Sequence, residues 1–567
     1  MKMNAYDKYQ KWLKSDAVEE SLKKELQAMN DKQIYEAFYK DLEFGTGGMR
    51  GIMGPGTNNM NSIVVKKATY GFGLYLLQKN PETAQKGVVI AHDNRQNSDL
   101  FTLEAAKVLA ALGIKSYIFD DLRPTPELSF AVRYLKAAGG IMITASHNPK
   151  EYNGYKIYNE DGCQLILEQS NQVLEKINQI EDELNILTVN QSPFIHVLSK
   201  EVDEAYYQMV LDTQIRKEMD HSSLKVVYSP QHGTGYVPVM EVLKRANYSV
   251  IDVKEQAYPS PTFENTLSPN PEEKDAYVAA IQVAKQHQAD IILTTDPDCD
   301  RVGLVILDKN KKPIYFTGNQ TGSLLMDYLL QSKKEKNELT MPSIVYNTIV
   351  TSPLGMKVAR SFGVLCEQTL TGFKYIGDKI ANALKNNGPT FQMGYEESYG
   401  YLFNPNVRDK DGVQSVLLIC EMAAYYKNQG KNLSEVYEQL QQRLGYHVES
   451  QYAYKVSGSE GLKEITKMME KLRQTKYETI QGEKVTTIED YLSLTSITNN
   501  QVTPLNYEQS NVLRYLFLDG SFIAIRPSGT EPKCKFYFAF CGKTAKEAQE
   551  RHDKMKAFIL SEIKNGL

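Results

Sequence analysis

Three aspartates follow an apolar segment near the middle of the chain. Residues 289–295 read A-D-I-I-L-T-T, and Asp296, Asp298 and Asp300 come next at alternating positions. In extended backbone, alternate side chains face the same side, so we expect the three carboxylates to converge. Converging carboxylates repel one another unless a cation holds them, and oxygen ligands of this kind suit Mg²⁺. The sequence therefore predicts a magnesium site rather than a solvated acidic turn.

A serine follows another apolar segment. Residues 141–143 form a predicted buried strand, and Ser146 lies in the loop after it, where open α/β sheets bind their ligands. A serine hydroxyl is a weak nucleophile unless a base, a metal or a charged neighbour activates it. We expect the adjacent His147 to point elsewhere, and Lys156 lies ten residues on. An ordinary loop serine is the alternative, but the complementary chemistry of the other loops favours a nucleophile.

Two glycine-containing loops carry groups that bind phosphate. Residues 525–533 read I-R-P-S-G-T-E-P-K, so Arg526, two hydroxyls and a glycine turn form a compact cradle for an anion. Residues 44–52 read F-G-T-G-G-M-R-G-I, where glycines let the backbone approach a ligand and Arg50 is suited to clamp a phosphate. The second spacing fits neither a P-loop nor a dinucleotide fingerprint. A structural turn is the alternative for both loops.

A further loop is suited to bind hydroxyl groups. Glu396 and Ser398 lie between glycines in G-Y-E-E-S-Y-G, and a carboxylate beside a hydroxyl can bind neighbouring sugar hydroxyls. The segment T-L-T-G-F-K at 369–374 precedes it. Taken by itself, this loop is equally well explained as a polar turn.

The segments that must position these loops alternate between strand and helix. Strands are predicted at 88–91 and 117–119, with a helix from Ser98 to Leu112 and another opened by Pro126. The same order restarts near residues 225 and 343, where the third such unit includes a strand predicted at 363–365. This pattern predicts mainly parallel sheets covered by helices.

A polar helical segment precedes these units, and short strands with one long charged segment follow Gly445. We therefore expect a helical lead-in, three α/β domains and a different fourth domain, with bounds 1–43, 44–200, 201–320, 321–445 and 446–567.

The composition excludes several classes of protein. The 567 residues carry 65 basic and 69 acidic side chains, a net charge of −4, which predicts neither a nucleic-acid nor a membrane partner. The six cysteines form no C-x-x-C pair, which disfavours a disulfide framework and a structural zinc site. The first residues lack an apolar signal-peptide core, and no run of about 18 apolar residues occurs, so we expect a cytoplasmic protein.

Together the loops resemble the signature motifs of one enzyme family. T-A-S-H-N-P, D-P-D-C-D-R, G-Y-E-E-S-Y-G and R-P-S-G-T-E-P-K are similar, in this order, to the four signature loops of the α-D-phosphohexomutases. G-T-G-G-M-R-G is similar to the N-terminal arginine loop of that family, which contains the phosphoglucomutases and phosphomannomutases. The long lead-in resembles the branch that also contains phosphopentomutases. The likeness implies four domains around a central cleft, three mixed α/β domains and a C-terminal α+β domain like the TATA-binding protein.

The resemblance implies roles for the candidate residues. Ser146 would carry the phosphoryl group and bind one Mg²⁺ per chain together with Asp296, Asp298 and Asp300. Lys156 matches the general acid/base of the family.

Arg301 matches an arginine of the cleft, and we count Arg50 and His147 with the catalytic candidates. Some relatives have a histidine after the sugar-binding serine, where this chain has Tyr399, so more of the proton transfer falls to Lys156. The expected substrate-binding residues are Thr371, Gly372, Lys374, Glu396, Ser398, Arg526, Ser528, Gly529 and Thr530.

The implied activity is that of a phosphosugar mutase, which interconverts α-D-glucose 1-phosphate and glucose 6-phosphate through a phosphoserine. Glucose 1,6-bisphosphate would be both intermediate and activator, and the only partners would be small sugar phosphates, with the chain a monomer or homodimer. Phosphopentomutase or phosphomannomutase activity is the alternative within the family. Outside it, the alternatives are a haloacid-dehalogenase-like phosphatase with an aspartate nucleophile and a non-catalytic sugar-phosphate-binding protein.

Overall fold

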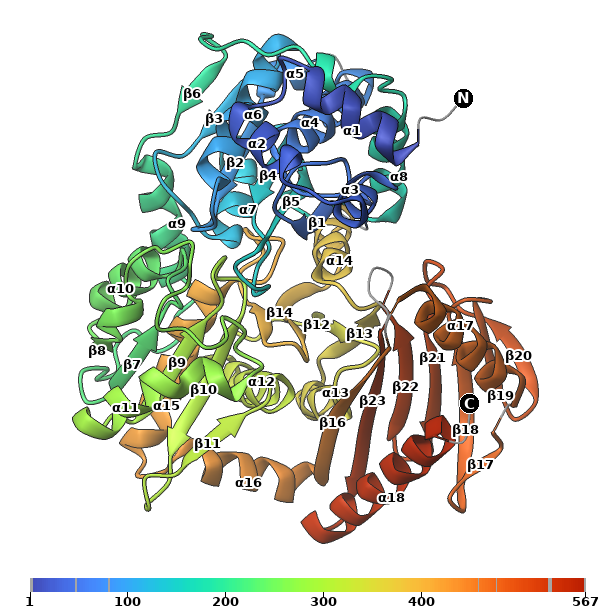
Figure 1. Ribbon diagram of the computed structural model, residues 1–567. Coiled ribbons are helices and arrows are strands. Elements are labelled where there is room, and N and C mark those ends of the chain that lie inside the picture. Colours follow the sequence, from blue (N-terminus) through green and yellow to red (C-terminus); the bar gives the residue numbers. More distant parts are fainter. Residues whose placement is uncertain are drawn as a thin grey trace. The chain divides into compact units, whose positions relative to one another are not determined.

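The chain divides into two compact units in the computed structural model (Figure 1). Unit 1 contains residues 1–321 and 373–429, and unit 2 contains residues 322–372 and 430–567. The structure describes residues 4–45, 48–79, 82–456, 458–475, 477–528 and 533–564.

Three short helices open unit 1, as the polar lead-in predicted: α1 (Ala5–Lys14), α2 (Glu20–Gln27) and α3 (Asp31–Phe38). Asn30 starts α3 with a capping box that includes the Gln33 side chain. The three helices bury Trp12 against Phe38, edge to face at 5.5 Å, and this cluster continues onto Ile63 of α4 (Ser62–Lys79). The lead-in is therefore docked on the first α/β domain.

The first sheet of unit 1 has six strands in the order β1-β5-β4-β2-β3-β6. Its central pairs β2–β4, β2–β3 and β3–β6 are parallel, as the strand–helix alternation predicted, whereas β5 runs antiparallel to β4 and β1. The strands are β1 (Gly48–Ile52), β2 (Val88–His92), β3 (Ser116–Ile118), β4 (Gly139–Ile143), β5 (Tyr152–Asn159) and β6 (Ile195–Val197).

Helices cover both faces of this sheet, and Val88–Ala91 of the central strand β2 are accordingly apolar and buried at four consecutive positions. Val88 and Ile90 pack in the cluster with α4, α6 and α8, whereas Val89 and Ala91 pack in the cluster with α7. The predicted helix beginning at Ser98 is confirmed and ends at Ala111, with Leu112 as its C-cap. The helices are α5 (Thr83–Lys86), α6 (Ser98–Ala111), α7 (Thr125–Tyr134) and α8 (Leu167–Asn178).

The second sheet of unit 1 has the strand order β11-β10-β9-β7-β8. β7 is parallel to β8 and β9, and β10 returns antiparallel to β9. The strands are β7 (Lys225–Ser229), β8 (Ser249–Asp252), β9 (Ile291–Thr295), β10 (Val302–Leu307) and β11 (Pro313–Phe316). The associated helices are α9 (Glu201–Leu211), α10 (Tyr236–Arg245), α11 (Val278–His287) and α15 (Gly412–Asn428).

The third strand–helix series is divided between the units. Unit 1 contains α14 (Phe373–Lys385) and the hairpin of β14 (Thr390–Glu396) with β15 (Gly400–Leu402). The strand expected at 363–365 begins only at Leu365, because Gly363 (φ 72°) still belongs to the turn after α13. The elements of unit 2 in this series are β12 (Ser343–Thr348), α13 (Pro353–Ser361), β13 (Leu365–Thr369) and α16 (Leu433–Leu444), and α12 (Gly318–Glu335) spans the division.

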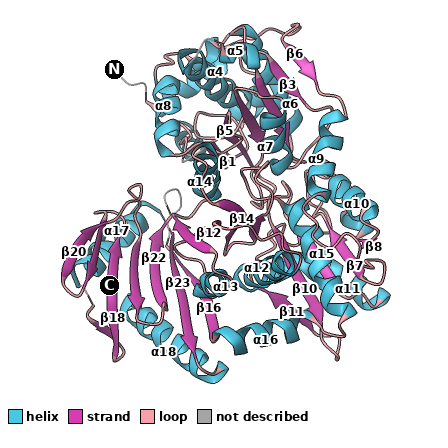
Figure 2. Cartoon of the chain, turned by 180° about the vertical axis from the view of Figure 1, so that it is seen from behind, coloured by secondary structure: helices cyan, strands magenta, loops and turns pink. Residues whose placement is uncertain are grey.

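The C-terminal part of unit 2 is an antiparallel sheet in the order β16-β23-β22-β21-β18-β19-β20, with β17 beside β18. α17 (Gly458–Thr475) and α18 (Ala545–Lys564) lie on one face of it, which turns away from the viewer in Figure 2. The strands are β16 (Tyr446–Lys455), β17 (Thr479–Ile480), β18 (Glu483–Asp490), β19 (Thr495–Thr498), β20 (Gln501–Pro504), β21 (Leu513–Phe517), β22 (Phe522–Pro527) and β23 (Lys533–Gly542).

The prediction of short strands is wrong for β16 and β23, which are ten residues long and pair along their whole length. In β23, Cys534, Phe536, Phe538 and Phe540 alternate and all join the cluster under the two helices, and no proline or glycine interrupts them. An uninterrupted period of two supports a strand of this length.

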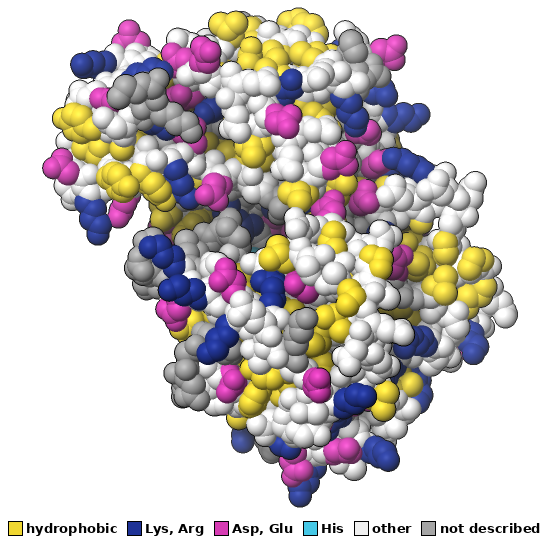
Figure 3. Space-filling model, turned by 90° about the vertical axis from the view of Figure 1, so that its right-hand side faces the viewer, with side chains coloured by type: hydrophobic (Ala, Val, Ile, Leu, Met, Phe, Trp, Pro, Cys, Tyr) yellow, Lys and Arg dark blue, Asp and Glu magenta, His cyan; other side chains and the backbone are white. Residues whose placement is uncertain are grey.

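The surface carries both signs of charge. On the face drawn in Figure 3, basic and acidic described side chains are interspersed, in keeping with the net charge of −4. None of the helices in the described ranges is sufficiently long and apolar to cross a membrane.

Candidate functional site

The three aspartates converge in the loop after β9. One carboxylate oxygen each from Asp296, Asp298 and Asp300 lies within 4.8 Å of the others, and all three residues are buried. The predicted convergence is confirmed, but the reason given for it was wrong, because the backbone is not extended here. The N–H of Cys299 donates to the carbonyl of Asp296 (2.9 Å), and Cys299 has φ 54°. A tight turn, not strand alternation, gathers the carboxylates.

These oxygens fit a bound cation. The Oδ1 atoms of Asp298 and Asp300 are buried and have no hydrogen-bond partner among the described residues, as expected of oxygens that serve as metal ligands. Burial and the neighbouring carboxylates of Asp298 and Asp300 hold the pKa of Asp296 well above its ordinary value. A divalent cation would relieve this repulsion.

Lys156 extends from β5 to the same carboxylates. Its Nζ lies 2.8 Å from Oδ2 of Asp298 and 3.5 Å from Oδ2 of Asp300. Burial alone would lower the pKa of Lys156, but the two carboxylates raise it above its ordinary value. Although burial opposes ionisation of Asp298, Lys156 holds the pKa of that carboxyl below its ordinary value. Lys156 is therefore a protonated group beside the loop of the three aspartates, residues 296–301, which we call the metal loop.

Ser146 faces this loop from the end of β4. Its Oγ donates a hydrogen bond to Oδ2 of Asp296 (2.7 Å), and its backbone has φ 51°. The side chain of His147 was expected to point elsewhere, and this was wrong: its Nδ1 lies 3.1 Å from Ser146 Oγ. The left-handed backbone at Ser146 turns both side chains to one side. Burial, with the guanidiniums of Arg301 and Arg50, holds the pKa of His147 well below its ordinary value, so the ring is neutral.

Arg95 fixes the backbone of the loop at residues 144–152, which we call the serine loop. The sequence did not predict this role of Arg95. Its NH2 donates to the carbonyl of Ser146 (2.6 Å) and that of Asn148 (2.6 Å), and its NH1 donates to those of Pro149 (2.9 Å) and Tyr152 (2.8 Å). The available signal was the charged stretch that directly follows the apolar β2.

Asp93 neutralises Arg95, since its Oδ2 lies 3.2 Å from the arginine Nε. The same oxygen accepts from Thr144 Oγ1 (2.7 Å), and Thr144 Oγ1 accepts the N–H of Ser146 (2.8 Å). The carbonyl of Ser146 is thus held by Arg95 and its N–H by Thr144, and Asp93 joins the two partners.

Arg50 comes to the serine loop from β1. Its NH1 donates to Oδ1 of Asn148 (2.7 Å), and β1 pairs with the strand of Lys156 in the register Gly48 to Lys156. The glycine loop before it is described only in part, since Thr46 and Gly47 lie outside the described residues.

Arg301 follows the metal turn. Its backbone N–H donates to Oδ1 of Asp296 (2.9 Å), and its guanidinium donates to the carboxylate of Glu272, which sequence reasoning missed. Although burial disfavours the charge, Glu272 and Asp300 raise the pKa of Arg301 above its ordinary value. The segment around Glu272 reads as an ordinary polar loop, so no local signal identified it.

The hairpin of β14 and β15 brings the sugar-binding candidates to unit 1. Glu396 ends β14 and is buried, and its charge acts on Arg301. Ser398 is half-buried in the turn, which is joined to β10 by a bond from the N–H of Val302 to the carbonyl of Tyr399 (3.0 Å). Lys374, near the start of α14, is buried with its Nζ over the ring of Tyr375 (4.8 Å).

Lys410 is a second lysine at the metal loop that sequence reasoning missed. Its Nζ lies 3.1 Å from Oδ2 of Asp300 and 3.1 Å from Oδ1 of Asp409, whose Oδ2 accepts from the hydroxyl of Tyr158 (2.7 Å). Gly400 makes room for it, because a Cβ there would lie 2.0 Å from Cδ of Lys410. The charged run R-D-K-D-G before α15 was visible, but such runs usually form helix caps, as Asp411 does here.

The remaining binding candidates belong to unit 2. Arg526 lies near the end of β22, and the N–H of Ser528 donates to the carbonyl of Lys533 (2.8 Å), which closes the cradle loop. Gly529 and Thr530 lie outside the described residues. Thr371 and Gly372 (φ 122°) form the turn after β13.

Known proteins resemble the chain along most of its length. Four family profiles match, described as phosphoglucomutase/phosphomannomutase alpha/beta/alpha domain I (residues 41–184), domain II (204–309), domain III (317–444) and C-terminal domain (458–557). A phosphoglucomutase of Staphylococcus haemolyticus is 38% identical over 510 residues, covering 89% of this chain and 91% of its own.

Solved structures share the fold. A phosphoglucomutase/phosphomannomutase family protein of Burkholderia thailandensis has a TM-score of 0.67 at 18% identity, covering 92% of this chain and 97% of its own. The open form of a Paramecium phosphoglucomutase, parafusin, has a TM-score of 0.64 at 20% identity and covers 93% of this chain and 95% of its own. The profile matches and the identity to curated relatives place this chain in the phosphoglucomutase/phosphomannomutase family.

Proposed function

We propose that the chain is a phosphosugar mutase that interconverts α-D-glucose 1-phosphate and glucose 6-phosphate. The observation that carries the proposal is the contact of Ser146 Oγ with Asp296, 2.7 Å apart, inside a buried group of three aspartates. A hydroxyl beside a metal site and two lysines is placed to carry and transfer a phosphoryl group. The relatives named phosphoglucomutase support the same activity.

In the first half of the proposed reaction, phosphorylated Ser146 gives its phosphoryl group to the free hydroxyl of a sugar monophosphate. The bond from phosphorus to Ser146 Oγ breaks, a bond to the sugar oxygen forms, and the hydroxyl proton passes to a base. Lys156 is the proposed base, in its neutral form, because Mg²⁺ bound to Asp298 and Asp300 would screen the two carboxylates that otherwise keep it protonated. Asp296, Asp298 and Asp300 would hold Mg²⁺, which neutralises charge on the phosphoryl oxygens when bound.

In the second half, the resulting glucose 1,6-bisphosphate turns over and returns its other phosphate to Ser146. Glu396 and Ser398 are proposed to hold the sugar hydroxyls in both orientations. Arg526, with the cradle loop that follows it, is proposed to hold the phosphate that is not being transferred. A cradle of hydroxyls and backbone N–H groups suits this task, because it accepts either phosphate.

A variant that lacks the proposed nucleophile tests the proposal. Ser146→Ala should abolish turnover without altering the fold, because a loop serine contributes little to packing. Intact-mass measurement of the wild-type protein should show a species heavier by one phosphate, stable in acid, which the variant lacks. Wild-type activity in the variant, or an acid-labile phosphate retained on an aspartate, would favour the phosphatase alternative.

The preferred sugar is a separate question. Glu396 and Ser398 are suited to adjacent hydroxyls of a pyranose, so we expect a higher kcat/KM for glucose 1-phosphate than for ribose 1-phosphate, with mannose 1-phosphate intermediate. A furanose would leave buried polar groups unpaired. One enzyme preparation, with a trace of bisphosphate, should be compared on the three sugars, and a preference for ribose 1-phosphate would indicate a phosphopentomutase.

A further inference from the structure

A buried arginine in unit 1 forms no ion pair with any carboxylate that the structure describes. Arg408 is 1% exposed, and within the described ranges its guanidinium makes one hydrogen bond, a long one from NH1 to the carbonyl of Val407 (3.3 Å). Its Nε has no hydrogen-bond partner among the described residues. An arginine is rarely buried to this degree without a paired anion, because desolvating the cation is costly.

A second arginine lies beside it. The backbone N–H of Arg408 donates to Oγ of Ser129 in α7 (2.9 Å), and Arg133 follows Ser129 by one turn on the same face of that helix. The Nε of Arg133 is also buried and finds no hydrogen-bond partner in the described part of the chain, where NH1 makes a long bond to the carbonyl of Asp161 (3.3 Å). Burial and the charge of Arg133 lower the pKa of Arg408 to about 10.

The acidic side chain near both guanidiniums is already engaged. Asp161 forms an ion pair with Lys385, its Oδ2 lying 2.6 Å from the lysine Nζ. Among the described residues, neither arginine forms an ion pair, because the nearby carboxylate of Asp161 is paired with Lys385.

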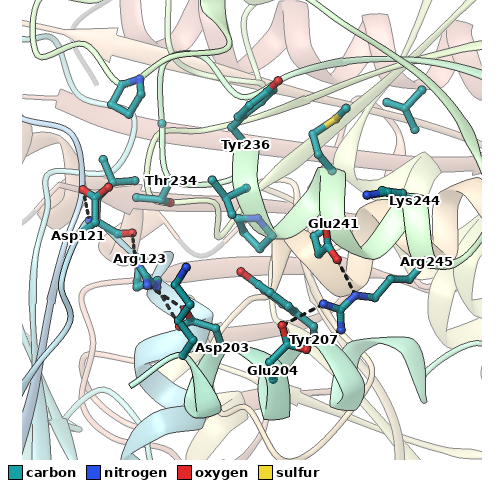
Figure 4. A pocket seen from close by; sticks show the side chains of 18 of the residues that line it. Asp121, Arg123, Asp203, Glu204, Tyr207, Thr234, Tyr236, Glu241, Lys244 and Arg245 are labelled. Carbon is teal, nitrogen blue, oxygen red and sulfur yellow. Dashed lines mark hydrogen bonds and ion pairs between the residues drawn. The ribbon is translucent and has the colours of Figure 1, made fainter. Parts of the chain in front are cut away.

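A pocket elsewhere in unit 1 contains two arginines for comparison (Figure 4). This cavity of 890 Å³ is lined by Arg123, which is paired with Asp203 and Asp120, and by Arg245, which is paired with Glu204 and Glu241. Each guanidinium there lies against at least two carboxylates, and Arg123 also lies 3.9 Å from Glu127.

We propose that Arg133 and Arg408 form a binding site for a small inorganic anion of the size of chloride. The Nε–H groups of the two guanidiniums are unused donors among the described residues, and one bound anion would offset a charge that forms no ion pair with a described carboxylate. The surroundings limit the size of the ligand, because Ser129 and Cys163 are almost fully buried. Gly162 and Gly377 also pack so closely that a Cβ would lie 2.5 Å from the Ser129 carbonyl or 2.3 Å from that of Arg408.

The site is coupled to the metal loop through the next two residues. Asp409 is bonded to Tyr158, and Lys410 is paired with Asp300. An anion that restricts the motion of Arg408 would therefore also restrict the motion of Lys410. This consequence for activity rests on the proposed function, whereas anion binding does not.

The first experiment uses the wild-type protein without substrate or phosphate. Sodium chloride is exchanged for sodium gluconate at constant ionic strength, and we expect chloride to raise the Tm by about 2 °C. The ³⁵Cl resonance should broaden with added protein, and bromide should reverse the broadening. No response of either kind would show that water alone solvates the two guanidiniums, and would overturn the proposal.

Variants of the two arginines show whether the chloride response comes from this site. Arg408→Met and Arg133→Met should each abolish the chloride response, and the second variant serves if the first fails to fold. Arg245→Met is the matched control, because that arginine is paired with carboxylates, and it should retain the full response. A response that persists in both Arg408→Met and Arg133→Met would place the anion elsewhere and overturn the proposal. These readouts do not use turnover, so an inactive enzyme would leave the result interpretable.

Discussion

At the scale of single residues, two lysines face one aspartate. Asp300 lies 3.5 Å from Lys156 Nζ and 3.1 Å from Lys410 Nζ. The two ammonium groups hold the metal loop together, and they also compete with a cation for its oxygens. In the proposed reaction, the same ammonium groups would bind the phosphate oxygens of the sugar phosphate.

Lys410→Met separates these two effects. It keeps the aliphatic stem that passes over Gly400 and removes the charge. We expect kcat/KM for the sugar phosphate to fall about ten- to a hundredfold, the value of a charge-assisted bond, while less Mg²⁺ is needed for half-maximal activity. A merely damaged site would instead need more Mg²⁺. Lys427→Met, which removes a lysine paired with Asp290 elsewhere in unit 1, should change neither constant.

At the scale of elements, the lead-in helices are held to the first domain by charge as well as by apolar contact. Asp41 accepts from Lys8 of α1 (2.8 Å) and from Lys67 of α4 (2.8 Å), so one carboxylate links both helices. Burial would raise the pKa of Asp41, but the two lysines lower it to about 2.

The pH dependence of this link follows from the direction of that shift. Because the folded pKa lies below the unfolded one, the stabilisation is present above about pH 4 and is lost as the pH falls towards 2. Asp41 is half exposed, so solvent screening limits the contribution of its ion pairs to the stability of this link to about 0.5–1 kcal/mol.

Asp41→Asn should therefore speed amide exchange in α1 by about two- to fivefold at pH 7, with little change relative to wild type near pH 2. Asp16→Asn, an exposed position in the same lead-in, is the control. Equal exchange in the wild type and Asp41→Asn at pH 7 would show that apolar contacts alone hold α1.

At the scale of the whole molecule, each unit can be tested by itself, and the cradle loop after β22 belongs to unit 2. Arg526→Ala should raise KM for sugar phosphates about ten- to a hundredfold with little effect on Tm, because it removes one charge-assisted phosphate contact. Arg473→Ala, which removes an arginine paired with Asp490 in the same unit, should leave KM unchanged. An unaltered KM in Arg526→Ala would assign the distal phosphate to another group.

The sequence predicted most of what is local in this structure. Helix starts, buried strands and loop motifs depend on neighbouring residues, so the helix at Ser98 and the serine after β4 were found. Arg95, Glu272 and Lys410 were missed, because their roles depend on contacts that no periodicity records. The three aspartates were identified by the wrong geometry, since alternation in a sequence does not distinguish a strand from a turn.

The frame of the serine loop has a consequence for how such a protein can diverge. All four bonds from Arg95 to the loop end on backbone carbonyls, which every amino acid provides. These four bonds therefore make no demand on the side chains at 149–152, although Asn148 also accepts a bond from Arg50 through its side chain. Substitutions at 149–152 do not by themselves remove any bond that holds the loop of Ser146. A lineage built on this arrangement can alter the rim of its active site while inheriting the position of the nucleophile unchanged.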